Sequence, residues 1–145
     1  MTDQLRFVTP ADPLFAGASA LRYEVLHRPL GLASDADWDD ADPHSRHLVA
    51  VRGETVVGYA RLVMTDRAAR IRHLAVDPTA RHGGVGAKLM QELITQARRE
   101  GRTLIWVNAR FTALGFYRGL GFHEAGGLTA AEDTQMPHKR MELRL

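Results

Sequence analysis

Residues 74–89 read Leu-Ala-Val-Asp-Pro-Thr-Ala-Arg-His-Gly-Gly-Val-Gly-Ala-Lys-Leu, and this stretch decides the fold. Its apolar start predicts the end of a strand, Asp77-Pro78 predicts a turn, and the glycine-rich run leads into a helix. Backbone N–H groups at a helix start have no partner inside the helix, and the helix dipole adds partial positive charge there. Glycines permit positive φ and a close approach of a ligand, and Arg81 adds a full charge. The stretch therefore predicts a cradle for a diphosphate.

Composition is ordinary for a globular protein. The chain has 145 residues, of which 45% are hydrophobic and 25% charged, so we expect one domain over residues 1–145. It has no cysteine, which excludes disulfides, thiol catalysis and zinc–thiolate sites and fits a cytoplasmic location. The first residues lack the pattern of a signal peptide. No apolar run approaches the roughly 20 residues of a membrane helix, so we expect no membrane partner.

Charge and acidic residues argue against two classes of partner. The formal net charge is +2, and the arginines are spread out rather than clustered with aromatic residues, so we expect no nucleic acid. The acidic residues 33–45 lack the spacing and glycine of a calcium loop. His44 and His47 have no third ligand nearby. We interpret 33–45 as a solvated loop with a short helical turn around Trp38, and we expect no metal.

Hydrophobic spacing predicts a mixed sheet with helices on both faces, an α/β or α+β layer fold. Strands are expected over 5–8, 47–52, 55–64, 69–76, 104–109 and 138–145, and helices over 13–28, 85–100 and 111–120. The strands between 47 and 76 have short turns, which predicts an antiparallel meander, with Gly58 weakening the packing of its second strand. The strand–loop–helix–strand unit that follows predicts a parallel pair.

Two common phosphate-binding loops do not match the glycine run. In a P-loop the lysine follows a glycine and precedes Ser or Thr, and Lys88 has neither neighbour. A dinucleotide loop has Gly-x-Gly-x-x-Gly near the N-terminal strand, whereas Gly83, Gly84 and Gly86 lie in mid-chain after antiparallel strands. We therefore reject both kinds of nucleotide-binding loop.

The pattern Arg81-x-x-Gly84-x-Gly86 resembles the acetyl-CoA loop of the GNAT superfamily of N-acetyltransferases. Residues 74–78 precede it as the family's fourth strand and turn do, and Asn108-Ala109-Arg110 ends a fifth strand. Residues 113–122 look like the family's next helix and its Leu-Gly-Phe turn, and residues 136–141 are similar to the ElaA-like branch of small bacterial members. The resemblance covers most of the chain. It implies a single-domain GNAT fold whose mostly antiparallel sheet is splayed between the fourth and fifth strands.

The same resemblance implies acetyl-CoA as co-substrate. The residues it assigns to donor binding are Leu74, Ala75, Val76, Arg81, His82, Gly83, Gly84, Val85, Gly86, Ala87, Asn108 and Tyr117. The glycine loop would bind the diphosphate mainly through backbone N–H groups. Leu74 and Val76 would hold the pantetheine arm through their backbone, like an added strand, while their side chains lie in the core. Asn108 would hydrogen-bond the pantetheine.

The implied chemistry is acetyl transfer from a thioester to an amine. Reaching the neutral amine from an ammonium of pKa ~10.4 costs about 4.6 kcal/mol at pH 7, so a base or a desolvating pocket must help. A backbone N–H near Leu74, freed by a β-bulge, would stabilise the oxyanion. Tyr117 matches the family's tyrosine and is the expected general acid, with a core tyrosine beside Phe116 as the alternative.

The general base stays open between Glu24 on the first helix, His138 on the last strand and a water chain. Strand alternation puts Arg70 and Arg72 on one face, where they would bind an acidic acceptor or lie exposed. Alternation also predicts that only one of Arg72 and His73 faces the acceptor.

The expected function is transfer of an acetyl group to a primary amine of a small molecule or a protein. The acceptor pocket should come from the first helix and residues 28–45 and 123–138, whose shape the sequence does not provide. A homodimer is a further expectation, because family members are often dimers. The alternative function, from another class, is a non-catalytic acetyl-CoA-binding or regulatory protein.

Overall fold

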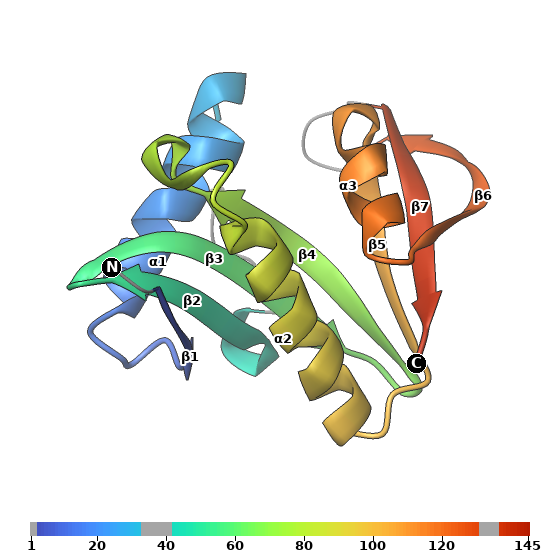
Figure 1. Cartoon of the computed structure of the whole chain (residues 1–145), viewed down its shortest axis with the longest axis horizontal. Coiled ribbons are helices and arrows are strands. Elements are labelled where there is room, and N and C mark those ends of the chain that lie inside the picture. Colours follow the sequence, from blue (N-terminus) through green and yellow to red (C-terminus); the bar gives the residue numbers. More distant parts are fainter. Residues whose placement is uncertain (1–2, 33–41, 131–136) are drawn as a thin grey trace.

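The chain folds around one twisted sheet, seen in a computed structural model that describes residues 3–32, 42–130 and 137–145 (Figure 1). The sheet has seven strands in the order β1-β2-β3-β4-β5-β7-β6. They are β1 (Gln4–Val8), β2 (Arg46–Arg52), β3 (Thr55–Met64), β4 (Ala68–Val76), β5 (Leu104–Arg110), β6 (His123–Ala130) and β7 (Pro137–Arg144). Neighbouring strands are antiparallel except β4 and β5, which are parallel. The predicted mixed sheet and its parallel pair are confirmed.

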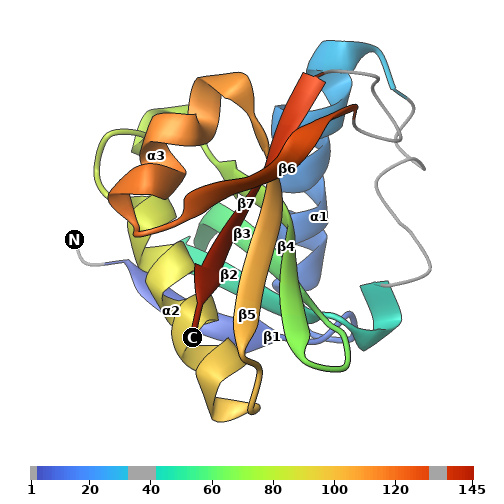
Figure 2. The ribbon, with the colours of Figure 1, turned by 90° about the vertical axis from the view of Figure 1, so that its right-hand side faces the viewer.

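Helices cover both faces of this sheet (Figure 2). The α-helices are α1 (Phe15–Arg22), α2 (Val85–Arg99) and α3 (Leu114–Gly119). One buried cluster joins α1 to β2 and β3, and a second joins α2 and α3 to the opposite face. The apolar stripe predicted for α2 is buried against the sheet: Val85, Leu89, Met90, Leu93, Ile94 and Ala97. The two-faced arrangement is therefore confirmed.

The first helix departs from regular α geometry where it reaches the site described below. The predicted helix over 13–28 is α-helical only to Arg22, continues as a π-helical turn over Tyr23–His27 and ends as a 3₁₀ turn over Arg28–Leu30. Pro29 fits this last turn because the first residues of a helix need no N–H partner. The π-helical turn ends at His27, whose side chain is buried.

Gly58 sets how closely α2 lies on the sheet. A Cβ atom at this position would lie 2.8 Å from Cγ1 of Val85 and 3.0 Å from Cδ1 of Leu89. The expectation that Gly58 weakens packing is wrong, because the missing side chain lets the start of α2 approach β3. This contact fixes the position of the glycine loop that precedes α2.

Strands β4 and β5 separate after a short common stretch. Their pairing runs from Ala68–Leu104 to Ile71–Val107, and beyond it the two strands diverge (Figure 1). The predicted splay between the fourth and fifth strands is therefore present, and it opens the space for a ligand.

A β-bulge lies in β4 where the splay begins. Arg61 pairs with His73 and Leu62 pairs with Ile71, so Arg72 is an extra residue in β4. The extra residue reverses the alternation of the strand. Ile71 packs on the α2 side, whereas Ala75 packs on the α1 side.

Candidate functional site

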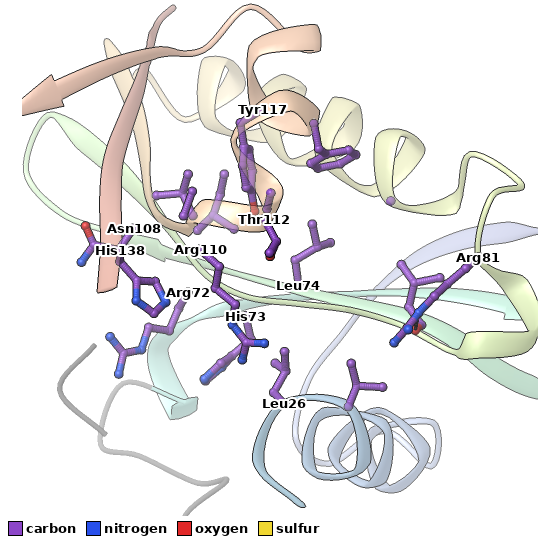
Figure 3. A pocket seen from close by; sticks show the side chains of 18 of the residues that line it. Leu26, Arg72, His73, Leu74, Arg81, Asn108, Arg110, Thr112, Tyr117 and His138 are labelled. Carbon is purple, nitrogen blue, oxygen red and sulfur yellow. Dashed lines mark hydrogen bonds between the residues drawn. The ribbon is translucent and has the colours of Figure 1, made fainter. Parts of the chain in front are cut away.

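A cavity of about 1080 Å³ lies where β4 and β5 diverge (Figure 3). Its walls come from β4, β5, the end of the first helix, the glycine loop, α3 and β7. Its volume is at the upper end of the range for small-molecule pockets, so it has room for a large ligand.

The cavity brings together residues that the sequence assigned to one site. The assigned residues on its wall are Leu74, Val76, Arg81, His82, Gly86, Asn108, Tyr117 and His138. Ala75 and Val85 are buried in the two cores instead. Gly83, Gly84 and Ala87 belong to the loop and first turn of α2 but are not on the cavity wall.

A tight turn aims the glycine loop at the cavity. The carboxylate of Asp77 accepts hydrogen bonds from the N–H of Thr79 at 2.9 Å and from its hydroxyl at 2.6 Å, and these bonds lower the pKa of Asp77. Pro78 starts the 3₁₀ turn that follows. Arg81 then folds back, and its Nε donates to the carbonyl oxygen of Val76 at 3.2 Å. The Arg81 guanidinium is thereby held against the end of β4.

Only one of the three loop glycines takes the positive φ that glycine permits. Gly84 does so, with φ of +80° at the start of α2, but Gly83 and Gly86 do not. His82 adopts φ of +68° although it has a side chain. The left-handed turn therefore falls on His82 and Gly84.

Gly86 leaves space between two cavity-lining side chains. A Cβ atom there would lie 3.5 Å from Cζ of Phe116 and 3.8 Å from Cγ2 of Val76. A larger side chain would fill this part of the cavity, next to the unpaired N–H groups at the start of α2. The gap fits a slim anionic group that passes close to the backbone.

Tyr117 has its ring in the core and its hydroxyl toward the cavity (Figure 3). The ring makes edge contacts with Phe116 and Phe122, at centroid distances of 5.1 and 5.6 Å. Burial raises the pKa of Tyr117, so the phenol stays protonated at neutral pH. Within the described part of the chain, no group accepts a hydrogen bond from this hydroxyl.

The two candidate bases lie in different places. Glu24 is exposed, both of its carboxylate oxygens lie 2.9 Å from Nη1 of Arg28, and it borders a separate depression. His138 is 7% exposed and lies on the wall of the main cavity. The geometry favours His138 over Glu24.

Arginine and histidine side chains line the end of the cavity near His138. The bulge lets both Arg72 and His73 reach the wall, so the prediction that only one of them faces the acceptor is wrong. Arg110 and His27 also line this end, and the sequence did not single them out for it. Burial, followed by the charges of Arg22 and other arginines, lowers the pKa of His73. His73 is therefore a neutral ring and too weak a base to accept a proton.

A buried ion-pair network lies on the α1 side of the sheet, and sequence reasoning missed it. Oδ1 of Asp42 accepts from Nη1 of Arg22 at 2.7 Å and from Nη1 of Arg61 at 2.8 Å. All three side chains are buried, so the interpretation of 33–45 as a solvated loop is wrong for Asp42. The predicted turn around Trp38 lies outside the described residues.

His47 continues this network as a neutral ring. A carbonyl can only accept, so Nε2 of His47 donates to the carbonyl oxygen of Asp42 at 2.7 Å. Its Nδ1 then accepts from the hydroxyl of Tyr59 at 2.6 Å. Burial lowers the pKa of His47, which agrees with this assignment. His47 has a structural role here, whereas His44 is exposed.

No group of three or more His, Asp or Glu side chains in the described part of the chain is placed to hold a metal ion. None of the helices in residues 3–32, 42–130 and 137–145 is long and apolar enough to cross a membrane.

Comparison with known proteins identifies the family. The sequence model of the acetyltransferase (GNAT) family matches residues 16–122. The chain is 28% identical over 123 residues to the uncharacterized N-acetyltransferase YjcF of Bacillus subtilis, covering 83% of this chain and 86% of that protein.

Solved structures show the same fold. Escherichia coli ElaA superposes with a TM-score of 0.82 at 19% identity, over 97% of this chain and 99% of that one. An aminoglycoside 6'-N-acetyltransferase complexed with coenzyme A superposes with a TM-score of 0.79 at 15% identity, over 97% and 96%. With the family match over most of its length, the chain belongs to the acetyltransferase (GNAT) family.

Proposed function

We propose that this acetyltransferase moves an acetyl group from acetyl-CoA to a primary amine of a small molecule or a protein. The observation that carries the proposal is the splay: pairing of β4 with β5 ends at Ile71 and Val107, and the cavity occupies the gap beyond. An elongated donor would enter this gap and pair with the free edge of β4. A structural neighbour that was solved with coenzyme A has the same fold and supports the choice of donor.

Donor binding is assigned to the glycine loop and the ends of the two splayed strands. The N–H groups at the start of α2 and the Arg81 guanidinium would hold the diphosphate. The gap at Gly86, beside Phe116 and Val76, leaves room for the part of the donor that follows the diphosphate. The backbone of Leu74–Val76 and the side chain of Asn108 would hold the pantetheine arm. These residues fit an elongated polyanion.

Three groups of the chain are proposed to act on the reacting atoms, for which bound acetyl-CoA supplies an acetyl group activated as a thioester. The backbone N–H of Leu74, just after the bulge, would stabilise the charge that develops on the carbonyl oxygen. Tyr117 would donate its proton, or a hydrogen bond, to the departing sulfur. His138, or a water molecule held on the cavity wall, would accept the proton of the amine.

The test of this proposal measures release of free thiol from acetyl-CoA with a panel of amines. We expect release with at least one amine, and a loss of turnover of about 100-fold or more in Tyr117→Phe with nearly unchanged affinity for the donor. The matched control is Tyr23→Phe, because the hydroxyl of Tyr23 donates to the carbonyl of Leu32 outside the cavity. Equal turnover in Tyr117→Phe and the wild type would refute the role of Tyr117. Donor binding without release for any amine would favour the non-catalytic alternative.

A cytoplasmic location and a homodimer belong to the same proposal. The lack of cysteine supports the first and family resemblance supports the second. Light scattering of the purified chain would test the dimer, and a monomer at micromolar concentration would refute it.

A further inference from the structure

We infer that the acceptor is a small amine that also carries a carboxylate, and that Arg72 and Arg110 bind this carboxylate. The inference rests on the proposed function and names the substrate class of the same cavity. It follows from the charges on the wall, from the partners of the arginines and from their place along β4.

The wall of the cavity is positively charged along its length. Its described residues include four arginines and no Asp or Glu; the arginines are Arg70, Arg72, Arg81 and Arg110. Like charges in a partly desolvated cleft repel one another, and a bound anion relieves this repulsion. The diphosphate of the donor accounts for Arg81 alone, since the other arginines lie elsewhere on the wall.

The other three arginines differ in the side chains that they contact. The guanidinium of Arg70 stacks on the ring of Trp106, with its Cζ 4.7 Å from the ring centroid. Arg72 and Arg110, in contrast, have neither an ion pair nor a hydrogen bond from their side chains within the described part of the chain. Both are half-buried, so they lose part of their hydration, and no described residue gives either of them a carboxylate in return. These two side chains are therefore open to an anionic ligand.

The position of Arg72 and Arg110 would place a bound carboxylate at the other end of the cavity from the diphosphate. Along β4 the order is Arg72, Leu74 and Val76, and Arg81 is bonded to the carbonyl of Val76. Figure 3 shows Arg72 and Arg110 on one side of Leu74 and Arg81 on the other. Arg110 ends β5 and pairs with His138 of β7. The reacting thioester at Leu74 would thus lie between a diphosphate site and a second anion site.

The same charges act on the amine of the acceptor. Nearby positive charge disfavours an ammonium and lowers its pKa, which raises the neutral fraction that can attack. A diamine or polyamine would bring a second positive charge to this wall and would be repelled. An amine whose other group is a carboxylate gains an arginine contact without that penalty, and guanidinium binds carboxylate through paired hydrogen bonds.

The experiment compares α-amino acids and 4-aminobutanoate with the primary amides of the same acids and with 1,4-diaminobutane. Initial rates of thiol release give kcat and KM for each amine. We expect the wild type to prefer at least one acid over its amide by about tenfold or more in kcat/KM, mainly through KM. Arg72→Gln and Arg110→Gln should reduce this preference to about twofold or less, because kcat/KM falls more for the acid than for its amide.

The matched control is Arg67→Gln, because Arg67 is an exposed arginine in the β3–β4 turn, outside the cavity. Its preference should equal that of the wild type. Preference for amides or for the diamine, or an unchanged preference in both cavity variants, would overturn the inference while leaving acetyl transfer intact.

Calorimetry on the protein saturated with coenzyme A separates failure of the inference from failure of the proposed function. Binding of an amino acid that is weakened in Arg72→Gln and Arg110→Gln supports the carboxylate site even if no thiol is released. No binding and no acetylation of any acid would overturn the inference. Arginine-dependent binding without release would contradict only the proposed catalysis.

Discussion

Two pairs of arginines lie close to the same sheet and differ in whether a described carboxylate pairs with them. Arg22 and Arg61 are fully buried on the α1 side, and both donate to the carboxylate of Asp42. Arg72 and Arg110 are half-buried on the wall of the cavity and have no carboxylate partner in the described part of the chain. The first pair has its carboxylate within the fold, whereas no described residue supplies one to the second pair.

The difference follows from access to water. A fully buried guanidinium must be paired within the fold, because an unpaired charge in the interior costs several kcal/mol. A half-buried guanidinium in a cavity keeps part of its hydration, so it can stay unpaired until a ligand arrives. A buried arginine with a carboxylate is thus a structural feature, and a cavity-lining arginine without one is a candidate binding residue.

Removing the shared carboxylate tests the structural side of this comparison and should have the largest effect. Asp42→Asn removes the charge that Arg22 and Arg61 share, and we expect a loss of about 3–5 kcal/mol in the free energy of unfolding. Urea denaturation followed by circular dichroism measures it.

The matched control for this prediction is Glu124→Gln, because Glu124 pairs with Arg118 at the exposed surface. Exposed pairs contribute about 0–1 kcal/mol, so this variant should remain close to the wild type. Equal losses in the two variants would contradict the structural role of Asp42.

His73 lies between the two pairs, and its titration should have the next largest effect. Burial and the charges of Arg22, Arg61 and Arg72 lower its pKa in the folded protein. The unfolded chain therefore binds a proton below about pH 6.5 that the folded chain does not, so stability falls as the pH falls. His73 alone should contribute a slope of about 1.4 kcal/mol per pH unit below that value.

The variant His73→Gln should lose this slope. Urea midpoints measured between pH 7 and pH 5 give the slope, with the exposed His123→Gln as control. A slope in His73→Gln equal to that of the wild type would mean that this ring titrates in the folded protein as it does in the unfolded chain.

Neutralising a cavity arginine should have the smallest effect on stability. Arg72→Gln removes a charge that has no ion pair or hydrogen bond with any described residue, so the free energy of unfolding should change by less than about 0.5 kcal/mol. The same urea titration measures this change. A loss comparable to that of Asp42→Asn would show that Arg72 has a structural partner, which would remove the contrast between the two pairs.

Local periodicity was enough to predict the three α-helices and every strand except β6 (His123–Ala130). The stripe of α2 repeats at the helical period, and the turn at Asp77-Pro78 followed by glycines marks the loop before it. Family resemblance then implied Arg81, Asn108 and Tyr117, and the structure places these residues on one cavity wall.

Features that depend on distant pairing could not be predicted. Asp42 is paired in the interior with Arg22, which lies 20 residues earlier in the chain and on the same α1 side of the sheet, and no local pattern reports this. The bulge at Arg72 arises from the register between β3 and β4, so strand alternation could not predict that both Arg72 and His73 line the cavity. The place of Arg72 on the cavity wall depends on that same bulge.

Donor binding by the glycine loop is the central claim. The two glycines that flank α2 allow a matched test of it. Gly84 and Gly101 lie at opposite ends of the helix, both have positive φ (80° and 76°), and neither has an atom within 4 Å of an added Cβ. Gly84→Val and Gly101→Val should therefore suffer similar backbone strain, but only Gly84 belongs to the proposed diphosphate cradle.

Titration calorimetry with acetyl-CoA on the folded wild type and both variants is the direct measurement. We expect micromolar affinity, about −8 kcal/mol, in the wild type and in Gly101→Val, and no measurable binding in Gly84→Val. Wild-type affinity in Gly84→Val would contradict the claim that this loop holds the donor.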